Sequence, residues 1–218
     1  MWLWLSPWKD SQAGEKKAPK ASANQDDSLP GPLFFLTLIK NKDPGLEEHL
    51  FRVEKLAREW IPKLLENRLL NAQQAEWFHS AALFHDLGKI HLRDSILLKP
   101  DRLNPVERSE MQNHSNWGYE LLLTIPGFEP VAEIVRFHHE RWDGFGYPSG
   151  LTHRAIPVES RLLSLIDSYD AMTSDRPYQA ARTHETALNE IQLQLGLQFC
   201  PVLGGRFLEF MNARRTQP

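Results

Sequence analysis

The stretch NAQQAEWFHSAALFHDLGK, residues 71–89, decides the class of fold. Its apolar residues, such as Trp77 and Ala81, recur at the three- and four-residue spacing of an amphipathic helix. Asn71 is a suitable N-cap, and Gly88 is a suitable residue to end the helix. The sequence therefore predicts a helix over residues 71–88 that carries a histidine and an aspartate near its C-terminal end.

Helical spacing continues from about residue 33 to residue 212, and no segment shows the sustained alternation that indicates strands. We therefore predict an all-α domain, a helical bundle of about seven helices. The expected helical segments run through residues 49–60, 71–88, 104–121, 129–140, 157–173, 183–195 and 201–212. Pro62 is expected to disturb the first of them. The glycines and prolines of DGFGYPSGLTHRAIP, residues 143–157, predict an irregular loop.

A length of 218 residues suits a single domain with tails. We assign residues 33–212 to the domain, residues 1–32 to a flexible N-terminal tail and residues 213–218 to a C-terminal tail. Residues 9–32 have almost no large apolar side chains, which is typical of segments without a core. Three tryptophans precede this segment: Trp2, Trp4 and Trp8. They could dock on this protein, on a partner or on a membrane interface, and the sequence does not decide among these.

Charge and composition exclude several classes of protein. The net charge of −3 lacks the basic footprint of a protein that binds polymeric nucleic acid. No run of about 18 apolar residues occurs, so we expect no transmembrane segment. The single cysteine, Cys200, excludes internal disulfides and favours a reducing compartment, so we predict a cytoplasmic location.

Two pairs of adjacent polar side chains suggest metal chemistry. His85 and Asp86 lie about 100° apart on a helix and can reach one point, although a structural hydrogen-bonded pair is the alternative. His138 and His139 follow an apolar helical run, so their rings can diverge toward two ions about 3.5–4 Å apart. A lone histidine in such a place is more often a packed core residue.

Three further residues fall on apolar helix faces and extend the set: His49, His114 and Asp167. Burying five imidazoles and two carboxylates without an ion would leave many costly unsatisfied groups. Mixed imidazole and carboxylate ligands without thiolate suit Fe, Mn, Zn, Ni or Co better than Ca or Mg, and we favour iron or manganese. Lys89, one turn beyond His85, can place an ammonium beside a phosphate; the alternative is a solvated lysine at a helix C-terminus.

Four motifs together resemble the HD-GYP phosphodiesterases, a branch of the HD hydrolase superfamily. They are HDLGK at 85–89, HHE at 138–140, RWDGFGYP at 141–148 and DSYDAMTSDRPY at 167–178. The resemblance covers about residues 33–212 and implies an HD-type helical bundle with a GYP loop.

Residue by residue, the resemblance implies seven metal ligands around two divalent ions. Asp86 would bridge the ions, His138 and His139 would bind the second ion, and Asp167 would close the first site. The implied ligands are His49, His85, Asp86, His114, His138, His139 and Asp167. Asp86 and Lys89 are the implied catalytic residues.

The resemblance also implies substrate contacts. Lys89 and Arg176 would contact phosphate. Five residues would shape the loop beside the pocket and bind substrate or a partner. They are Arg141, Asp143, Gly146, Tyr147 and Pro148. A purely architectural role of the loop glycines and proline is the alternative, as is a surface ion pair of Arg176 with Asp175 or Asp170.

Two positions depart from the family pattern. Members with a third metal have a glutamate one helical turn before the first-helix histidine, where this chain has Gly45. We therefore expect two ions and not three. Gln179 stands where the family often has a basic residue, which would weaken one phosphate contact.

The implied function is hydrolysis of cyclic di-GMP, a bacterial second messenger in signal transduction. A hydroxide bridging the two ions would open the ring to linear pGpG, with further cleavage to GMP left open. Two alternatives also stay open. One is an HD-type hydrolase of another cyclic dinucleotide or nucleotide phosphate ester; the other is a non-catalytic module that binds a protein partner through the GYP loop or the tryptophan-rich tail.

Overall fold

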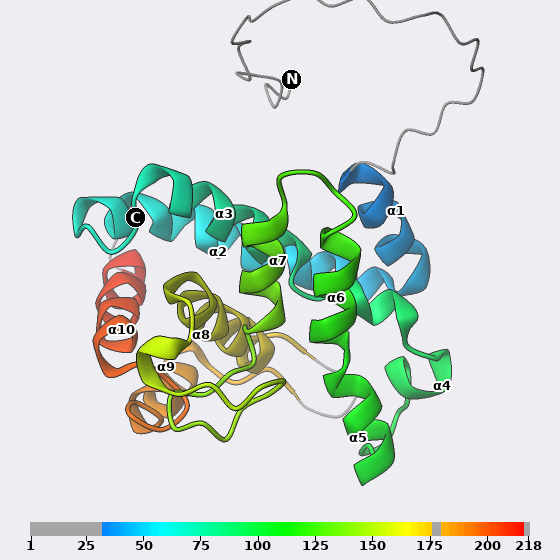
Figure 1. The fold of residues 1–218 in the computed structure, drawn as a ribbon. Helices are drawn as coiled ribbons and strands as arrows, with labels where there is room; N and C mark the ends of the chain where they lie inside the picture. Colours follow the sequence, from blue (N-terminus) through cyan, green and yellow to red (C-terminus); the bar gives the residue numbers. More distant parts are fainter. Residues whose placement is uncertain (1–31, 176–179, 216–218) are drawn as a thin grey trace, which may run out of the picture.

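The computed structural model describes residues 32–175 and 180–215, and these residues form a helical bundle (Figure 1). The α-helices are α1 (Pro32–Lys42), α2 (Pro44–Glu66), α3 (Ala72–Phe84), α4 (Asp94–Leu97), α5 (Pro105–Gln112), α6 (His114–Leu122), α7 (Glu129–Arg136), α8 (Val158–Thr173), α9 (His184–Leu193) and α10 (Pro201–Arg215). Two short 3-10 helices are η1 (Leu87–His91) and η2 (His153–Ala155). Within the described ranges the only β-type pairing is an isolated bridge between Leu195 and Phe199. The all-α prediction is confirmed.

Side-chain caps start the helices where the sequence indicated. Asn71 accepts a hydrogen bond from the Gln74 amide at 2.9 Å, and the Gln74 side chain accepts one from the Asn71 amide at 3.1 Å. Asn104 and Glu107 form the same reciprocal box at the start of α5. Each box satisfies two amides that a helix N-terminus would otherwise leave unpaired. The predicted starts of these two helices are confirmed.

Several predicted helix ends are wrong. The segment expected to be continuous over 104–121 breaks at Asn113, which ends α5 before α6 begins. The helix expected over 129–140 ends at Arg136, so His138 and His139 lie in the turn that follows it. Both breaks fall beside predicted metal ligands. His114 thus begins α6, and His138 and His139 lie outside α7.

Pro62 does not end α2, which continues to Glu66. The helix is held by its buried face, because Trp60 and Leu64 are each only 1% exposed on either side of the proline. The Trp60 ring packs edge-on against Phe207 of α10, with the centroids 5.1 Å apart. Burial of large apolar side chains on both sides of the proline outweighs the lost helical hydrogen bond.

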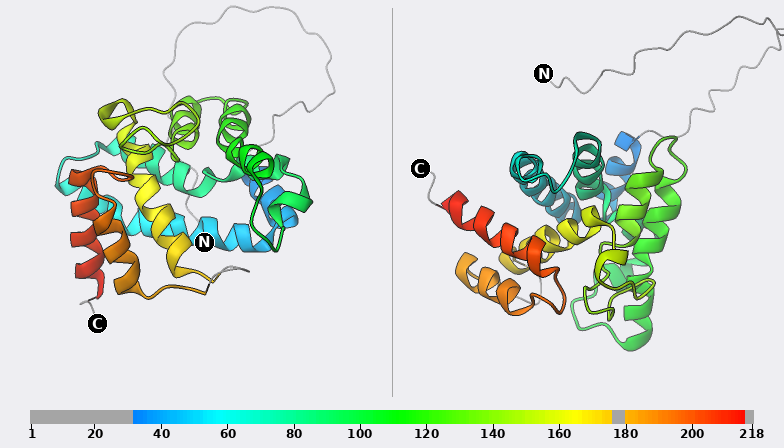
Figure 2. Two further views of the ribbon diagram at one scale, coloured as in Figure 1. Left: turned by 90° about the horizontal axis from the view of Figure 1, so that it is seen from below. Right: turned by 60° about the vertical axis from the view of Figure 1, so that its left-hand side comes forward.

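The helices surround one hydrophobic core. Helix α2 packs against α3 and α8, while α6 packs against η1 and α7. Helices α9 and α10 lie at one end of the molecule, and α4 and α5 lie at the opposite end (Figure 2). No helix among the described residues is both long and apolar enough to cross a bilayer.

Gly88 allows η1 and α6 to approach each other closely. A Cβ atom at this position would lie 2.0 Å from the carbonyl oxygen of His114 and 2.5 Å from the amide nitrogen of Gly118. Neither backbone atom belongs to a flexible side chain, so the two segments would have to separate. The prediction that the helix ends at Gly88 is wrong, because α3 ends at Phe84 and Gly88 lies within η1. The glycine instead brings the start of α6 against the turn that carries Asp86.

We expect Gly88→Ala to lower the free energy of unfolding by at least about 1–3 kcal/mol, because the added methyl group overlaps backbone atoms of α6. Denaturant unfolding followed by circular dichroism measures the change. Gly205→Ala in α10 is the matched control, since a Cβ there has no neighbour within 4 Å. It should stabilise the helix by about 0.5–1 kcal/mol. Equal effects of the two substitutions would contradict the close approach at Gly88.

Candidate metal centre

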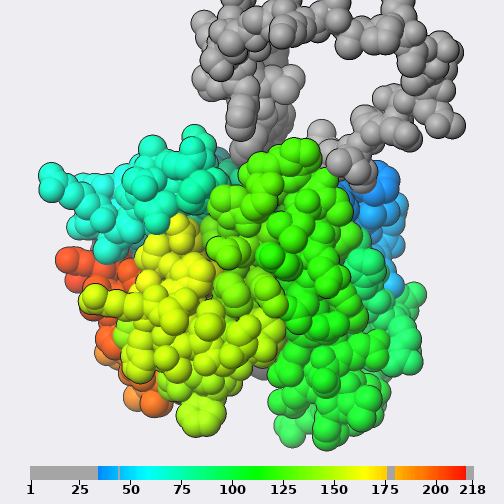
Figure 3. All heavy atoms as spheres, in the orientation of Figure 1, coloured from blue at the N-terminus to red at the C-terminus, as the bar shows by residue number. Residues whose placement is uncertain are grey.

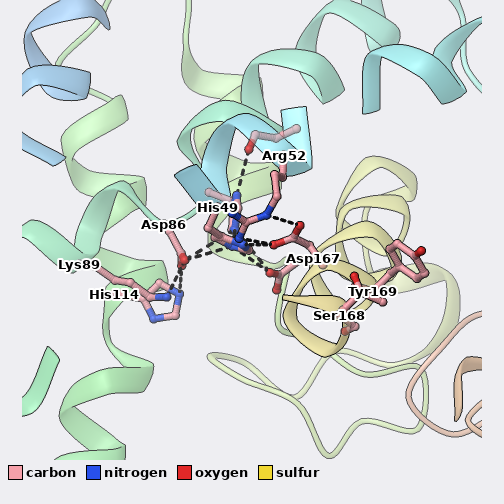
Figure 4. Close-up of polar contacts among 12 residues, drawn as sticks. His49, Arg52, Asp86, Lys89, His114, Asp167, Ser168 and Tyr169 are labelled. Atoms are coloured by element: carbon pink, nitrogen blue, oxygen red, sulfur yellow. Dashed lines mark hydrogen bonds and ion pairs between the residues drawn. The ribbon is translucent and has the colours of Figure 1, made fainter. Parts of the chain in front are cut away.

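Two groups of potential metal ligands lie side by side inside the bundle. In each group, ligand atoms of every member lie within 4.8 Å of one another. The first group is Asp86, His114, His138 and His139, and the second is His49, His85 and Asp167. Figure 4 shows His49, Asp86 and Asp167 pointing toward one another. The structure therefore gathers all seven side chains that the sequence singled out as ligands, although they are spread over more than 110 residues of chain.

Five segments of chain deliver these side chains. His49 lies on α2 and Asp167 on α8, while His85 ends α3 and Asp86 follows it. His114 is the first residue of α6, and His138 and His139 lie in the turn after α7. His85 is fully buried, and Asp86 and His114 are 2% and 1% exposed. Most of the ligands are therefore buried, whereas His139 and Asp167 are partly exposed.

Backbone carbonyl groups fix the orientation of three imidazoles. The Nδ1 atom of His85 donates to the carbonyl oxygen of Ala82 at 3.0 Å, and that of His114 donates to Met111 at 2.7 Å. His138 donates in the same way to the residue three positions before it. Because a carbonyl only accepts, Nδ1 carries the proton and the Nε2 lone pair faces the interior. This tautomer is the one that binds a metal through Nε2.

The inward nitrogens have little else to bind. The Nε2 atoms of His114 and His138 are buried without a hydrogen-bond partner among the described residues. The Nε2 atoms of His49 and His85 face each other at 3.1 Å, and Asp167 Oδ1 lies 3.3 Å from the former. Two lone pairs cannot share this gap unless a proton or a cation lies between them. The donor set therefore fits a divalent cation, as mixed imidazole and carboxylate ligands do in general.

Burial and neighbouring charges set the ionisation states. Burial lowers the pKa of His114 to about 4 and that of His138 to about 3, so both rings are neutral near pH 7. Burial raises the pKa of Asp86, but the charges of Lys89 and the imidazoles outweigh it and hold the pKa well below its usual range. Asp167 also keeps a pKa below its usual range, since bonds to His49 and His85 oppose the effect of burial. Neutral imidazoles and ionised carboxylates are the forms that bind metals.

His49 differs from the other imidazoles of the centre. Burial lowers its pKa, but hydrogen bonds to Asp167 and Asp170 raise it, and the net value is about 9. The ligand group that contains His49, His85 and Asp167 therefore attracts positive charge strongly. A proton holds that position in the metal-free protein, and a cation with a higher charge satisfies the same surroundings.

Of the two predicted phosphate contacts, Lys89 lies among the described residues and Arg176 does not. The Nζ atom of Lys89 lies 2.5 Å from Asp86 Oδ2, so the ammonium stands at the edge of the centre. Arg176 and Gln179 lie outside the described residues. Among the described residues, Arg52 binds both carboxylate oxygens of Asp170.

The GYP loop covers one side of the centre. The Tyr147 ring lies against His139, with centroids 4.8 Å apart and an angle of 30° between the planes. A Cβ at Gly146 would lie 2.3 Å from the Arg141 amide nitrogen, so the loop passes directly over the backbone that follows the histidine pair. The peptide bond from Tyr147 to Pro148 is cis. Figure 3 shows this segment, in yellow-green, packed beside the green helices α6 and α7.

Arg141 and Asp143 bind each other in this structure. The guanidinium donates to both carboxylate oxygens of Asp143, at 3.0 and 2.7 Å, and to the side chain of Gln198 at 3.3 Å. The amide of Asp143 also bonds to the carbonyl of Leu197. These contacts fasten the loop to the connection between α9 and α10. Arg141 and Asp143 thus help to set the position of the loop; whether they also bind substrate or a partner stays a prediction.

The sequence interpretation missed three polar residues around the centre. Arg52 and Asp170 form a bidentate ion pair beside His49. Glu140, 3% exposed, accepts hydrogen bonds from the amides of Ser149 and Leu151 and so anchors the GYP loop. A signal was present for two of them, since Arg52 and Asp170 each lie three residues after a predicted ligand and hence on the same helix face.

Comparisons with known proteins identify the family of the chain. A family model described as HD domain matches residues 35–201. A cyclic di-GMP phosphodiesterase of Thermotoga maritima is 43% identical over 198 residues, which cover 89% of this chain and 53% of that protein. A 3'3'-cGAMP-specific phosphodiesterase of Vibrio cholerae is 36% identical over 155 residues, covering 68% of this chain and 30% of that protein. The chain thus spans about half, or less, of the length of these relatives.

A solved structure described as an HDG"Y"P protein from Bdellovibrio bacteriovorus superposes with a TM-score of 0.60. The alignment covers 78% of this chain and 52% of that one at 17% sequence identity. At that identity the likeness concerns the fold alone. It agrees with the predicted HD-type helical bundle.

We expect His138→Ala to lower the affinity of the protein for manganese by at least about 10–100-fold, since it deletes a buried nitrogen with no protein partner. Equilibrium dialysis against Mn²⁺ followed by elemental analysis measures the bound metal. His91→Ala is the control, because His91 is exposed and its ring lies against Trp117. Metal content that is unchanged in His138→Ala, or absent in the parent protein, would count against this site.

Proposed function

Since the chain belongs to the HD domain family, we propose that it is a metal-dependent phosphodiesterase of the HD-GYP kind that hydrolyses cyclic di-GMP to linear pGpG. The observation that carries the proposal is the pairing of two adjacent ligand groups, one around Asp86 and one around Asp167. Adjacent groups of this kind suit two-metal chemistry on phosphate esters. Further cleavage to GMP belongs to the same proposal as a second step.

The seven gathered side chains are proposed as ligands of two divalent ions, with Asp86 between them. His49 Nε2 and His114 Nε2 both approach Asp86, at 3.7 Å from Oδ2 and 3.3 Å from Oδ1 respectively. Each carboxylate oxygen of Asp86 thus faces a different ligand group, which supports a bridging role. Iron and manganese fit this donor set, and we propose them as the resident metals.

Divalent ions in such a pair supply a nucleophile from water at neutral pH and offset negative charge on a phosphoryl group. The protein adds an ammonium at the edge of the centre, because Lys89 is only partly exposed and adjoins Asp86. There it can donate to a phosphoryl oxygen whose charge grows during the reaction. The Tyr147 ring lies against His139, where it would limit the access of bulk water from this side. Arg176 is proposed to hold the second phosphate.

The substrate class rests on the GYP motif and on what the relatives are named for. Gly146 and Tyr147 lie directly against the ligand segment, so the motif that also contains Pro148 is placed where it could contact a substrate bound at the centre. The Thermotoga relative is named for cyclic di-GMP and a Vibrio relative for 3'3'-cGAMP. Cyclic di-GMP is our proposal, and cyclic GMP-AMP is the competing substrate that the test must include.

Two further parts of the proposal concern location and partners. A reducing compartment such as the cytoplasm suits the single cysteine, Cys200, which is buried and free. A protein partner can contact the GYP loop through Phe145, whose surface is 86% exposed. The tryptophans of the N-terminal tail lie outside the described residues.

We expect manganese-loaded protein to linearise cyclic di-GMP, and the double variant His85→Ala, Asp86→Ala to lose both turnover and bound metal. Chromatography of reactions with cyclic di-GMP, 3'3'-cGAMP and a simple phosphodiester measures the products. Preference for 3'3'-cGAMP would replace the proposed substrate. Turnover by protein from which a chelator has removed all metal would contradict the mechanism.

Lys89→Met should lower kcat by about 10²–10³-fold while leaving metal binding intact, because it deletes a donor to the phosphoryl group and no proposed ligand. Steady-state kinetics together with elemental analysis of the same preparation separates the two effects. Lys55→Met is the control, since Lys55 lies on the exposed face of α2. Unchanged kcat in Lys89→Met would remove this residue from the mechanism.

A further inference from the structure

We propose that Arg52 and Asp170 are positioning residues that hold His49 in its metal-binding orientation and so control occupancy of the His49, His85 and Asp167 group. The inference rests on the proposed function only in so far as that group binds a metal ion. It does not depend on which cyclic dinucleotide is cleaved.

Three hydrogen bonds converge on the Asp170 carboxylate. Arg52 donates from Nε to Oδ1 at 2.8 Å and from Nη2 to Oδ2 at 3.0 Å, and His49 Nδ1 lies 2.7 Å from Oδ2. Asp170 is 4% exposed, so water does not replace these bonds readily. An ionised carboxylate only accepts hydrogen bonds, so Nδ1 of His49 must be the donor. The remaining nitrogen, Nε2, then faces the ligand group (Figure 4).

His49 is held in a different way from three other histidines of the centre. His85, His114 and His138 each donate to a carbonyl of the turn that precedes them, so their orientation follows from local backbone structure. His49 donates instead to a side chain on α8, 121 positions further along the chain. The orientation of its ring therefore depends on how α2 packs against α8 and on the state of one carboxylate.

Arg52 fixes that carboxylate. Its two parallel N–H bonds set the plane of the Asp170 carboxylate as well as its position, which a single ammonium cannot do. All three donors around Asp170 need an oxygen acceptor. An asparagine has one oxygen and one NH₂ group, so Asp170→Asn must break at least one of the three bonds and place two donors face to face.

The consequence is an unequal dependence of the two ligand groups. Among the described residues, Arg52 and Asp170 form no hydrogen bond with Asp86, His114, His138 or His139, whereas Asp170 bonds directly to His49 of the other group. Loss of the Arg52 and Asp170 pair should therefore weaken one ion and spare the other. A general loss of structure would weaken both.

The experiment titrates the chelator-treated 218-residue chain with Mn²⁺ in the absence of substrate. Isothermal titration gives the stoichiometry and affinities, and electron paramagnetic resonance distinguishes a spin-coupled manganese pair from an isolated ion. We expect two ions and a coupled spectrum for the parent protein. Asp170→Asn and Arg52→Met should each weaken one ion by about 10–100-fold and give the spectrum of an isolated ion. Arg52→Lys keeps the positive charge but loses the two parallel N–H donors. Its affinity for the weakened ion should lie between that of the parent protein and that of Arg52→Met.

Glu110→Gln is the matched control, because Arg93 binds Glu110 in the same bidentate way, at 3.0 and 2.6 Å, and neither residue is a proposed ligand. It should leave both ions unchanged. Two ions bound with parental affinity in Asp170→Asn and Arg52→Met would overturn the inference, and so would equal weakening of both ions in either variant with a native circular dichroism spectrum. Should Asp170→Asn not fold, Arg52→Met decides, since the Arg52 side chain is 43% exposed and its loss leaves the core filled. Parental protein that binds two ions but cleaves no cyclic dinucleotide would contradict the proposed function alone.

Discussion

The structure depends on one constraint: five imidazoles and two carboxylates come together inside a helical bundle, and each of their polar atoms needs a partner. Burial removes the water that would otherwise bind these groups, and unpaired buried polar atoms are costly. Protein hydrogen bonds satisfy only the outward side of the rings, where His85 and His114 donate to backbone carbonyls. The inward nitrogens need a cation. The fold supplies the close approaches that this requires, most directly at Gly88, where η1 and α6 touch backbone to backbone.

The sequence predicted the type of fold and the identity of the gathered side chains better than it predicted where the helices that carry these side chains end. The caps at Asn71 and Asn104 act locally, so the starts of α3 and α5 could be read from a few residues. The break at Asn113 and the early end of α7 at Arg136 could not, because apolar spacing continues across both. The spacing of apolar residues indicates which face of a helix is buried, but it does not indicate where the helix is interrupted.

The same limit applies to the supporting residues of the centre. His49 was recognisable from its apolar helix face and its family position, whereas the carboxylate that orients it comes from another helix far along the chain. Glu140 lies within a recognisable motif, but its bonds to the amides of Ser149 and Leu151 exist only once the GYP loop has folded back. Tertiary hydrogen bonds of this kind leave little trace in local sequence patterns. They nevertheless decide how rigidly the ligands are held.

The central claim is that the two ligand groups hold two metal ions next to each other. Crystals of the manganese-loaded protein, measured with X-rays on either side of the manganese absorption edge, test it most directly. The account predicts two anomalous peaks, one among Asp86, His114, His138 and His139 and one among His49, His85 and Asp167. A map without anomalous density among these side chains, from protein shown to be loaded with manganese, would contradict it.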